Sequence, residues 1–374
     1  MTDIYEDVSQ VDDDETLLSS MMSFVLEGDP MYAPTNYWSY YSKYFMPELT
    51  KRGLKDFRRR RDSILRSFGA TDLFPYAEIR NADSPMLKGR PPTDKGKLGK
   101  VLTKIVEAIP GVRLSIDGLS PQEFVEYTIW RATPYFERKG LNIHKSRSTL
   151  IGNPEGIRHV DGMKWTYQQA QYCLTFGIAM QNVDVPEQGV FCDLGAGMGR
   201  QVEIVAAQYP EMTCLAFDIP PQLYVCNQFL KKRFPDRVVE FKDAINLDIS
   251  GKTEVPEELR GKIIVLPPNK MPEWANIKVD LFWNSACFQE MEPDIVRNYL
   301  NLVKQMRTEI IYINALPSGN YWGEWKEGRG GTKEPVKDEI FRTELAEAYD
   351  LTEEYWTDYI ARRPYYRSYL FRRR

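Results

Sequence analysis

Long apolar runs are missing from this 374-residue sequence. No stretch approaches the roughly 18 consecutive apolar residues of a membrane-spanning helix. The N-terminus is acidic, whereas a secretory signal would be basic and then apolar. Together these absences predict a cytoplasmic protein without a membrane span.

Cysteine and histidine are scarce. The five cysteines are an odd number with no Cys-x-x-Cys pair, and the only histidines are His144 and His159. This pattern argues against a disulfide framework and against a zinc cluster. The acids form no dense cluster with the histidines, so we expect no bound metal.

An excess of basic residues is also absent. The chain has 49 Lys and Arg against 53 Asp and Glu, for a net charge of −4. Proteins that bind duplex nucleic acid are more often clearly basic, so we do not expect a nucleic-acid partner. With 43% hydrophobic, 27% charged and 13% aromatic residues, the composition is that of a globular protein.

The first half of the sequence carries helical patterns. We expect helices over residues 31–66, over 98–109, from a capping signal at Ser120, and over 165–180. The run of four arginines at 58–61 is flanked by Asp56 and Asp62, which favours a solvated helix face. This half predicts a mainly helical cap on the acceptor side, over residues 1–160.

From Val190 onward, short apolar runs alternate with helical stretches. Such alternation predicts a mostly parallel sheet with helices on its faces, within a domain of residues 161–374. We expect the run "VVEFKDA", which ends near Asp243, to be the third strand. The last 24 residues join two aromatic runs without a helix, which predicts an antiparallel hairpin at the edge of the sheet.

The stretch "VFCDLGAGMGRQ" places three glycines after a predicted strand and before a predicted helix. A turn of this kind aims backbone N–H groups at a ligand and allows it to approach closely. No Lys–Ser/Thr pair ends the turn, which excludes a phosphate-loop NTPase. The glycine spacing also fails the Gly-x-Gly-x-x-Gly pattern of dinucleotide-binding folds.

The spacing Asp-x-Gly-x-Gly-x-Gly, from Asp193 to Gly199, resembles that of class I S-adenosylmethionine (SAM) methyltransferases. An acid at the turn suits SAM, which carries an ammonium and a sulfonium, but would repel a pyrophosphate. Asp218 ends the second predicted strand about 20 residues beyond the last glycine, the spacing of a ribose-binding acid. The resemblance implies a Rossmann-like α/β fold and SAM as cofactor, with S-adenosylhomocysteine (SAH) as product.

The same resemblance implies a set of cofactor-binding residues: the turn, the ends of the second and third strands, and the segment after the fourth. These are Asp193, Gly195, Ala196, Gly197, Gly199, Arg200, Asp218, Ile219, Asp243, Ala244, Asn284, Ser285 and Phe288.

Two further segments, "DIPPQLYV" from Asp218 and "FQEM" from Phe288, resemble a group of sugar O-methyltransferases. That resemblance implies methylation of a hydroxyl on a sugar or glycosylated small molecule, in a biosynthetic setting. The place after the fourth strand reads "WNSACFQEM" and lacks the "NPPF"-like signature of enzymes that methylate nucleic-acid bases. A small-molecule acceptor is therefore expected, and a homo-oligomer is left open.

A sugar hydroxyl needs a base, or a metal that acidifies it, to become a good nucleophile. The candidate base is His159 or Glu290, with Asp161 orienting the imidazole. The alternative to a base is a divalent metal ion, which Asp161 could bind together with Glu290 or Glu292. His144 is a weaker candidate than His159.

The loop after the fifth predicted strand is suited to acceptor binding. Its candidate residues can bond hydroxyls or stack on sugar faces; they are Asn314, Tyr321, Trp322 and Trp325. Two other functions remain open. The protein could methylate an amine or amino acid, or it could be a non-catalytic partner protein that binds SAM.

Overall fold

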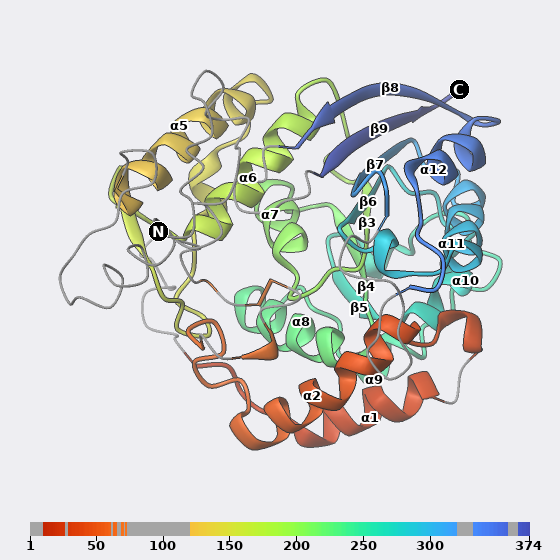
Figure 1. The fold of residues 1–374 in the computed structure, drawn as a ribbon, viewed down its shortest axis with the longest axis horizontal. Coiled ribbons are helices and arrows are strands. Elements are labelled where there is room, and N and C mark those ends of the chain that lie inside the picture. Colours follow the sequence, from red (N-terminus) through yellow and green to blue (C-terminus); the bar gives the residue numbers. More distant parts are fainter. Residues whose placement is uncertain are drawn as a thin grey trace, which may run out of the picture.

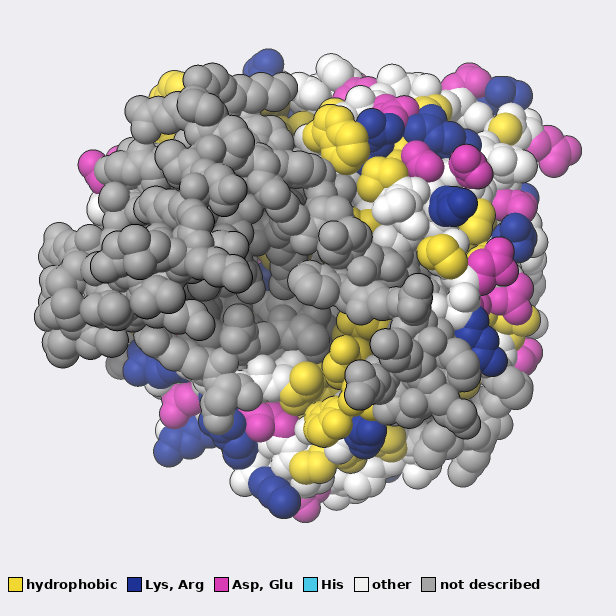
Figure 2. Space-filling view, viewed as in Figure 1, with side chains coloured by type: hydrophobic (Ala, Val, Ile, Leu, Met, Phe, Trp, Pro, Cys, Tyr) yellow, Lys and Arg dark blue, Asp and Glu magenta, His cyan; other side chains and the backbone are white. Residues whose placement is uncertain are grey.

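The structure, a computed structural model, describes residues 10–26, 29–60, 63–65, 69–70, 72, 120–319, 332–357 and 366–374. A central sheet runs through these residues with helices on both faces, and two N-terminal helices cross below it (Figure 1). Figure 2 shows hydrophobic side chains gathered over these two helices on the same face of the molecule.

The main sheet has seven strands in the order β5-β4-β3-β6-β7-β9-β8. Its parallel strands are β3 (Val190–Leu194), β4 (Thr213–Phe217), β5 (Ile263–Leu266), β6 (Leu281–Ser285) and β7 (Ile310–Ala315). Strand β9 (Arg367–Arg373) pairs antiparallel with β7, and β8 (Tyr349–Trp356), at that edge of the sheet, pairs antiparallel with β9. The predicted α/β fold, a mostly parallel sheet with a C-terminal antiparallel hairpin, is confirmed. A separate small hairpin pairs β1 (Arg158–Val160) with β2 (Met163–Trp165).

The prediction that "VVEFKDA" forms the third strand is wrong. Val238 makes only an isolated bridge with Ile263, and Phe241–Ala244 is a short helix, α9. The strand beside β4 is β5, whose four residues are all buried. Helices cover both faces of this sheet, and a continuous apolar run such as "IIVL" suits a strand between them better than a segment with charged Lys242 and Asp243.

The helices of the α/β part divide between the two faces of the sheet (Figure 1). On one face lie α6 (Tyr167–Met180), α7 (Arg200–Gln208) and α8 (Pro220–Arg233), and on the other α10 (Met271–Trp274), α11 (Pro293–Gln305) and α12 (Asp338–Leu345). Short 3-10 turns complete this part: η4 (Ile143–Ser146), η5 (Glu257–Leu259), η6 (Pro268–Lys270) and η7 (Phe288–Glu290).

The N-terminal part contributes α1 (Glu15–Leu26), η1 (Pro30–Tyr32), α2 (Asn36–Arg52) and α5 (Pro121–Arg138). Ser120 and Glu123 form the predicted capping box of α5, and the predicted helix over 165–180 is present as α6. The helix expected over 98–109 lies outside the described residues.

The prediction of a solvated helix face at 58–61 is wrong for Arg58 and Arg60, whereas Arg59 is exposed and residue 61 lies outside the described residues. Helix α2 already ends at Gly53, in a left-handed conformation with φ 58°. The chain then turns inward, so that Arg58 and Arg60 are only 1% and 8% exposed. Both find partners inside: Arg58 pairs with Asp72, and Arg60 with Glu48.

One hydrophobic core joins the N-terminal helices to the sheet. Phe136 of α5 contacts Phe176 of α6, which contacts Trp283 of β6, with ring centroids 5.8 and 6.2 Å apart. The division into domains 1–160 and 161–374 stays a prediction. Among the helices that the structure describes, none is both long and apolar enough to cross a bilayer.

Candidate cofactor and active site

The glycine turn lies at the carboxyl end of the central strand β3. Gly195 and Gly199 have backbone φ angles of 84° and 88°, which residues with a side chain rarely adopt. A Cβ atom on Gly195 would lie 2.5 Å from Cys287, and one on Gly199 would lie 2.9–3.0 Å from Leu230 and Cys226. Glycine is therefore required here both by backbone conformation and by space.

The turn is tied to the neighbouring strand by its own amides. The N–H groups of Gly195 and Ala196 donate to the Phe217 carbonyl over 2.8 and 3.2 Å. Gly197 donates to Oδ2 of Asp218 over 2.6 Å, and Ile219 donates to Oδ1 over 2.7 Å. The predicted ribose-binding acid thus lies directly against the turn.

Two carboxylates at this edge are held in an environment that disfavours their charge. Burial raises the pKa of Asp218 to about 7, although the N–H groups of Gly197 and Ile219 lower it. Burial also raises the pKa of Asp193 well above its ordinary value, and the charge of Asp218 raises it further. A cationic ligand would offset both effects, and this fits the ammonium and sulfonium of SAM.

The segment after β6 closes the turn from the other side. Asn284 is buried; its Nδ2 donates to the Leu194 carbonyl over 2.9 Å, and its Oδ1 accepts from the Phe288 N–H over 3.2 Å. Ala286, with φ 60°, adopts a conformation that is unusual for a residue with a side chain. Asn284 therefore shapes this turn, and half-buried Cys287, which the sequence reasoning missed, packs on Gly195.

Asp243, predicted to bind the cofactor, is exposed on α9, and its contact with the cofactor stays a prediction. A polar residue also lies just after the end of β5. Asn269, on η6, has a buried Oδ1 atom with no hydrogen-bond partner among the described residues. Its Nδ2 lies 3.5 Å from the Phe24 carbonyl. Only the double proline of "VLPPN" marks this place in the sequence. Ala244 is buried beside Asp243, on the same short helix.

The N-terminal segment crosses the same edge of the sheet. Tyr32 packs against Tyr299 of α11, with ring centroids 5.7 Å apart. Thr35 Oγ1 donates to the Glu290 carbonyl over 2.9 Å. We call residues 29–35 the strap; it runs from the end of β5 to the end of β6.

The three candidate catalytic residues are not brought together. His159 is exposed on β1, and Asp161 with Gly162 forms the two-residue turn of the β1–β2 hairpin, both with positive φ. Glu290 lies on η7, at the carboxyl end of β6. Among the described residues, no hydrogen bond or ion pair links Glu290 to His159 or Asp161.

Glu290 nevertheless lies close to the cofactor turn. Burial raises the pKa of the Cys287 thiol, and the charges of Asp218 and Glu290 raise it further. Both acids are thus within electrostatic reach of one side chain. Glu292 has a different role: its carboxylate accepts from the backbone N–H groups of Lys333 and Glu334 over 2.9 and 3.1 Å.

No group of three or more metal-binding side chains occurs in the described part of the chain. Among the predicted acceptor residues, Tyr321, Trp322 and Trp325 lie outside that part. Asn314 is buried on β7, where its Nδ2 lies 3.0 Å from Ser368 Oγ and its Oδ1 has no partner among the described residues.

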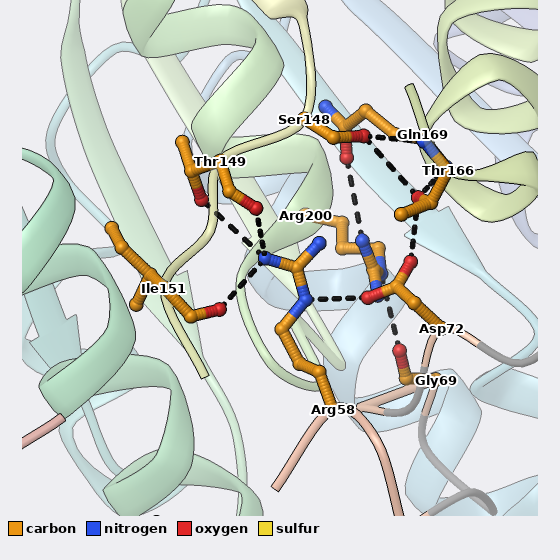
Figure 3. Close-up of polar contacts among 9 residues, drawn as sticks. All are labelled: Arg58, Gly69, Asp72, Ser148, Thr149, Ile151, Thr166, Gln169 and Arg200. Atoms are coloured by element: carbon orange, nitrogen blue, oxygen red, sulfur yellow. Dashed lines mark hydrogen bonds and ion pairs between the residues drawn. The ribbon is translucent and has the colours of Figure 1, made fainter. Parts of the chain in front are cut away.

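The Arg200 side chain points into a buried cluster with the N-terminal segment (Figure 3). Its guanidinium donates to Asp72 over 2.6 Å and to the Gly69 carbonyl over 3.1 Å. Phe288, also predicted to bind the cofactor, is fully buried against Phe282. A direct cofactor contact by these side chains stays a prediction, as it does for the half-buried Ser285.

Comparison with known proteins matches residues 160–244 to the model of an O-methyltransferase domain. A search of curated protein sequences found no significant match. The mitomycin 7-O-methyltransferase structure is similar with 11% identity over 55% of this chain, and the chain spans 57% of that protein, with a TM-score of 0.34.

Two SAH-bound structures are also similar. Magnesium protoporphyrin IX methyltransferase from Synechocystis PCC 6803 has 11% identity over 56% of this chain and 88% of its own, with a TM-score of 0.35. The 1,6-didemethyltoxoflavin-N1-methyltransferase from Burkholderia thailandensis, bound to 1,6-didemethyltoxoflavin and SAH, has 16% identity over 55% of this chain and 78% of its own, with a TM-score of 0.35. The O-methyltransferase match begins before the glycine turn and includes both Asp193 and Asp218, so the segment that carries the predicted cofactor site is the one that resembles an O-methyltransferase domain.

Proposed function

We propose that the protein transfers a methyl group from SAM to a hydroxyl of a sugar or a sugar-bearing small molecule. The observation that carries the methyl-transfer part is the pairing of the glycine turn with Asp218, inside a segment that matches an O-methyltransferase domain. The sugar part rests on the resemblance of "DIPPQLYV" and "FQEM". A cytoplasmic location and a homo-oligomeric state stay predictions.

The cofactor would lie along the carboxyl ends of β5, β4, β3 and β6. Asp218 would accept hydrogen bonds from the ribose hydroxyls, because a carboxylate that accepts two N–H bonds still has lone pairs to offer. Asn269 would accept from the amino group of adenine through its unpartnered Oδ1. When bound, SAM supplies a methyl group made electrophilic by its sulfonium.

We assign the role of base to Glu290. Of the three candidates, it is the one at the carboxyl edge of the sheet, where ligands bind in open α/β folds. The carboxylate would take the proton of the acceptor hydroxyl as the oxygen attacks. His159 and Asp161, on the exposed hairpin, are the alternative.

A polar cluster at the end of β7 supports a polar acceptor. Tyr312, Asn314, Thr357 and Ser368 gather their hydroxyl and amide groups there, and the Asn314 Oδ1 atom has no described partner. A buried acceptor atom of this kind favours a ligand that brings a donor. The cluster lies next to the turn after β6, since Ala286 donates to the Asn314 carbonyl over 2.8 Å.

Incubation with methyl-labelled SAM and a panel of glycosides, nucleoside-diphosphate sugars, amines and amino acids tests the proposal. Label on a sugar hydroxyl is the expected result, and label on amines alone would overturn it. SAH binding without transfer to any acceptor would point to a non-catalytic partner protein. Glu290→Gln should lower kcat while leaving SAH affinity intact, whereas the exposed Asp294→Asn on the next helix should change neither.

A further inference from the structure

Three fully buried charged side chains join the N-terminal segment to the start of α7 (Figure 3). Arg58, Asp72 and Arg200 are 1%, 1% and 2% exposed. Oδ2 of Asp72 accepts from both guanidinium groups, over 2.6 Å in the case of Arg200. Oδ1 of Asp72 accepts from Thr166 Oγ1 over 2.7 Å. We call Arg58, Asp72 and Arg200 the buried triad.

Each arginine of the triad has further partners in a different part of the fold. Arg58 donates to the carbonyls of Thr149 and Ile151 over 3.1 and 2.9 Å. Arg200 donates to the Gly69 carbonyl over 3.1 Å. Asp72 thus links two parts of the fold. One is the N-terminal segment after α2, which carries Arg58, and the other is α7, the helix that follows the glycine turn and carries Arg200.

The triad is ionised despite its burial. Burial would raise the pKa of Asp72, but the charges of Arg200 and Arg58 and the hydrogen bonds from Arg58 and Thr166 lower it below its ordinary value. With one carboxylate between two guanidinium groups, the set carries a net positive charge. Removing the carboxylate would leave two like charges buried without the acceptor that they share, a strongly unfavourable arrangement.

Arg200 is the first residue of α7, and Gly199, the last glycine of the turn, is the N-cap of that helix. A guanidinium held by several acceptors fixes the rotation of the helix turn that carries it. The same helix turn is continuous with Gly197, whose N–H group holds Asp218. Arg200, which Asp72 holds, is thus three positions along the chain from Gly197, which holds the ribose-binding acid.

We propose that Asp72 is a positioning residue for the cofactor turn, acting through Arg200, and that cofactor binding and docking of the N-terminal segment are coupled. This coupling is reciprocal by linkage: what strengthens one strengthens the other. The strap belongs to the same N-terminal segment and crosses the carboxyl edge of the sheet. A bound cofactor would therefore also stabilise the strap in this position.

A double-mutant cycle on SAH binding tests this role. Calorimetry would compare the wild type with Asp72→Asn, Arg200→Gln and the double variant. We expect about a tenfold loss of SAH affinity in each single variant and no further loss in the double variant, because Asp72 acts through Arg200. Arg200→Gln leaves a balanced Arg58–Asp72 pair, so this variant should fold. If Asp72→Asn does not fold, Arg200→Lys is measured instead. This variant keeps the positive charge but loses the planar guanidinium, and we expect the same tenfold loss of SAH affinity.

Amide hydrogen exchange gives a second readout that a merely structural residue would not move. In the wild type, SAH should slow exchange in the turn and also in α2, and Asp72→Asn should abolish the slowing in α2. Glu48→Gln, which breaks another ion pair of the N-terminal segment, should keep wild-type SAH affinity. Affinity within twofold of wild type in Asp72→Asn or in Arg200→Lys, or losses that multiply in the double variant, would overturn the proposal.

Discussion

Gly197 donates its backbone N–H to Oδ2 of Asp218 over 2.6 Å, and this bond joins the glycine turn after β3 to the acid after β4. Two features that are separate in the sequence are one unit in space. The turn supplies the carboxylate with a fixed orientation, and the carboxylate supplies the turn with an acceptor. Ligand binding at this edge should therefore depend on both the turn and the carboxylate.

Asp218→Asn should weaken SAH binding. A hydrogen bond to a charged group contributes about 2 kcal/mol, so the affinity should fall roughly thirtyfold. Calorimetric titration measures this directly, with Asp236→Asn, an exposed acid after α8, as the control that keeps full affinity. Undiminished binding by Asp218→Asn would remove Asp218 from the ribose site.

The affinity for SAH should rise with pH between 6 and 8. The pKa of Asp218 in the free protein is about 7, and the ionised form is the one that accepts two hydroxyl hydrogen bonds. Ligand binding must therefore release a proton at pH 6 but not at pH 8. The measurement is the affinity at several pH values in buffers of different ionisation enthalpy. A flat profile in the wild type would contradict the assignment.

The same shift predicts how stability depends on pH. The folded-state pKa of Asp218 is raised from 3.8 to about 7, so its contribution favours the folded protein at low pH and is lost as pH rises from about 4 to 7. Thermal unfolding of the ligand-free protein should show this loss, and SAH should offset it increasingly as pH rises. In Asp218→Asn, the gap between ligand-free and SAH-bound melting temperatures should no longer widen over this range.

Asn269→Ala should weaken SAH binding, and Asp243→Ala should not. The Oδ1 atom of Asn269 is buried without a described partner at the end of β5, whereas Asp243 is exposed on α9. Loss of one neutral hydrogen bond costs about 1 kcal/mol, which is roughly a fivefold loss of affinity. The two variants serve as each other's control, and the reverse outcome would favour Asp243 over Asn269 as the cofactor-binding residue.

The sequence predicted well those features that depend on local pattern. The glycine turn, its leading acid and Asp218 lie within about 25 residues of one another. The strands and the helix between these residues are short and alternate regularly. The third strand was missed because "VVEFKDA" and "IIVL" are both β-prone, and only pairing with β4 decides between them. Local propensity cannot supply that information.

The buried arginines were missed for a related reason. The side chains of a basic run between two acids in a helical pattern normally face solvent. No nearby sequence pattern indicates that Asp72 would pair with one of these arginines. Arg58 and Arg200 are far apart in the chain, and their shared acceptor exists only in the folded protein. Contacts that join distant segments through buried charge are not encoded in any short pattern.

Gly195→Ala should abolish SAH binding, and a matched glycine shows why. Gly195 and Gly251 both have positive φ, at 84° and 70°, so alanine strains the backbone by about 1 kcal/mol in either place. A Cβ on Gly251 meets nothing within 4 Å, but one on Gly195 would lie 2.5 Å from Cys287. The turn must then move away from the segment after β6, and Gly197 with it. SAH affinity should therefore collapse in Gly195→Ala and stay at the wild-type level in Gly251→Ala, as measured by calorimetry on variants whose folding is checked by circular dichroism. Equal affinity in both variants would mean that the close approach of Gly195 to Cys287 has no part in forming the site.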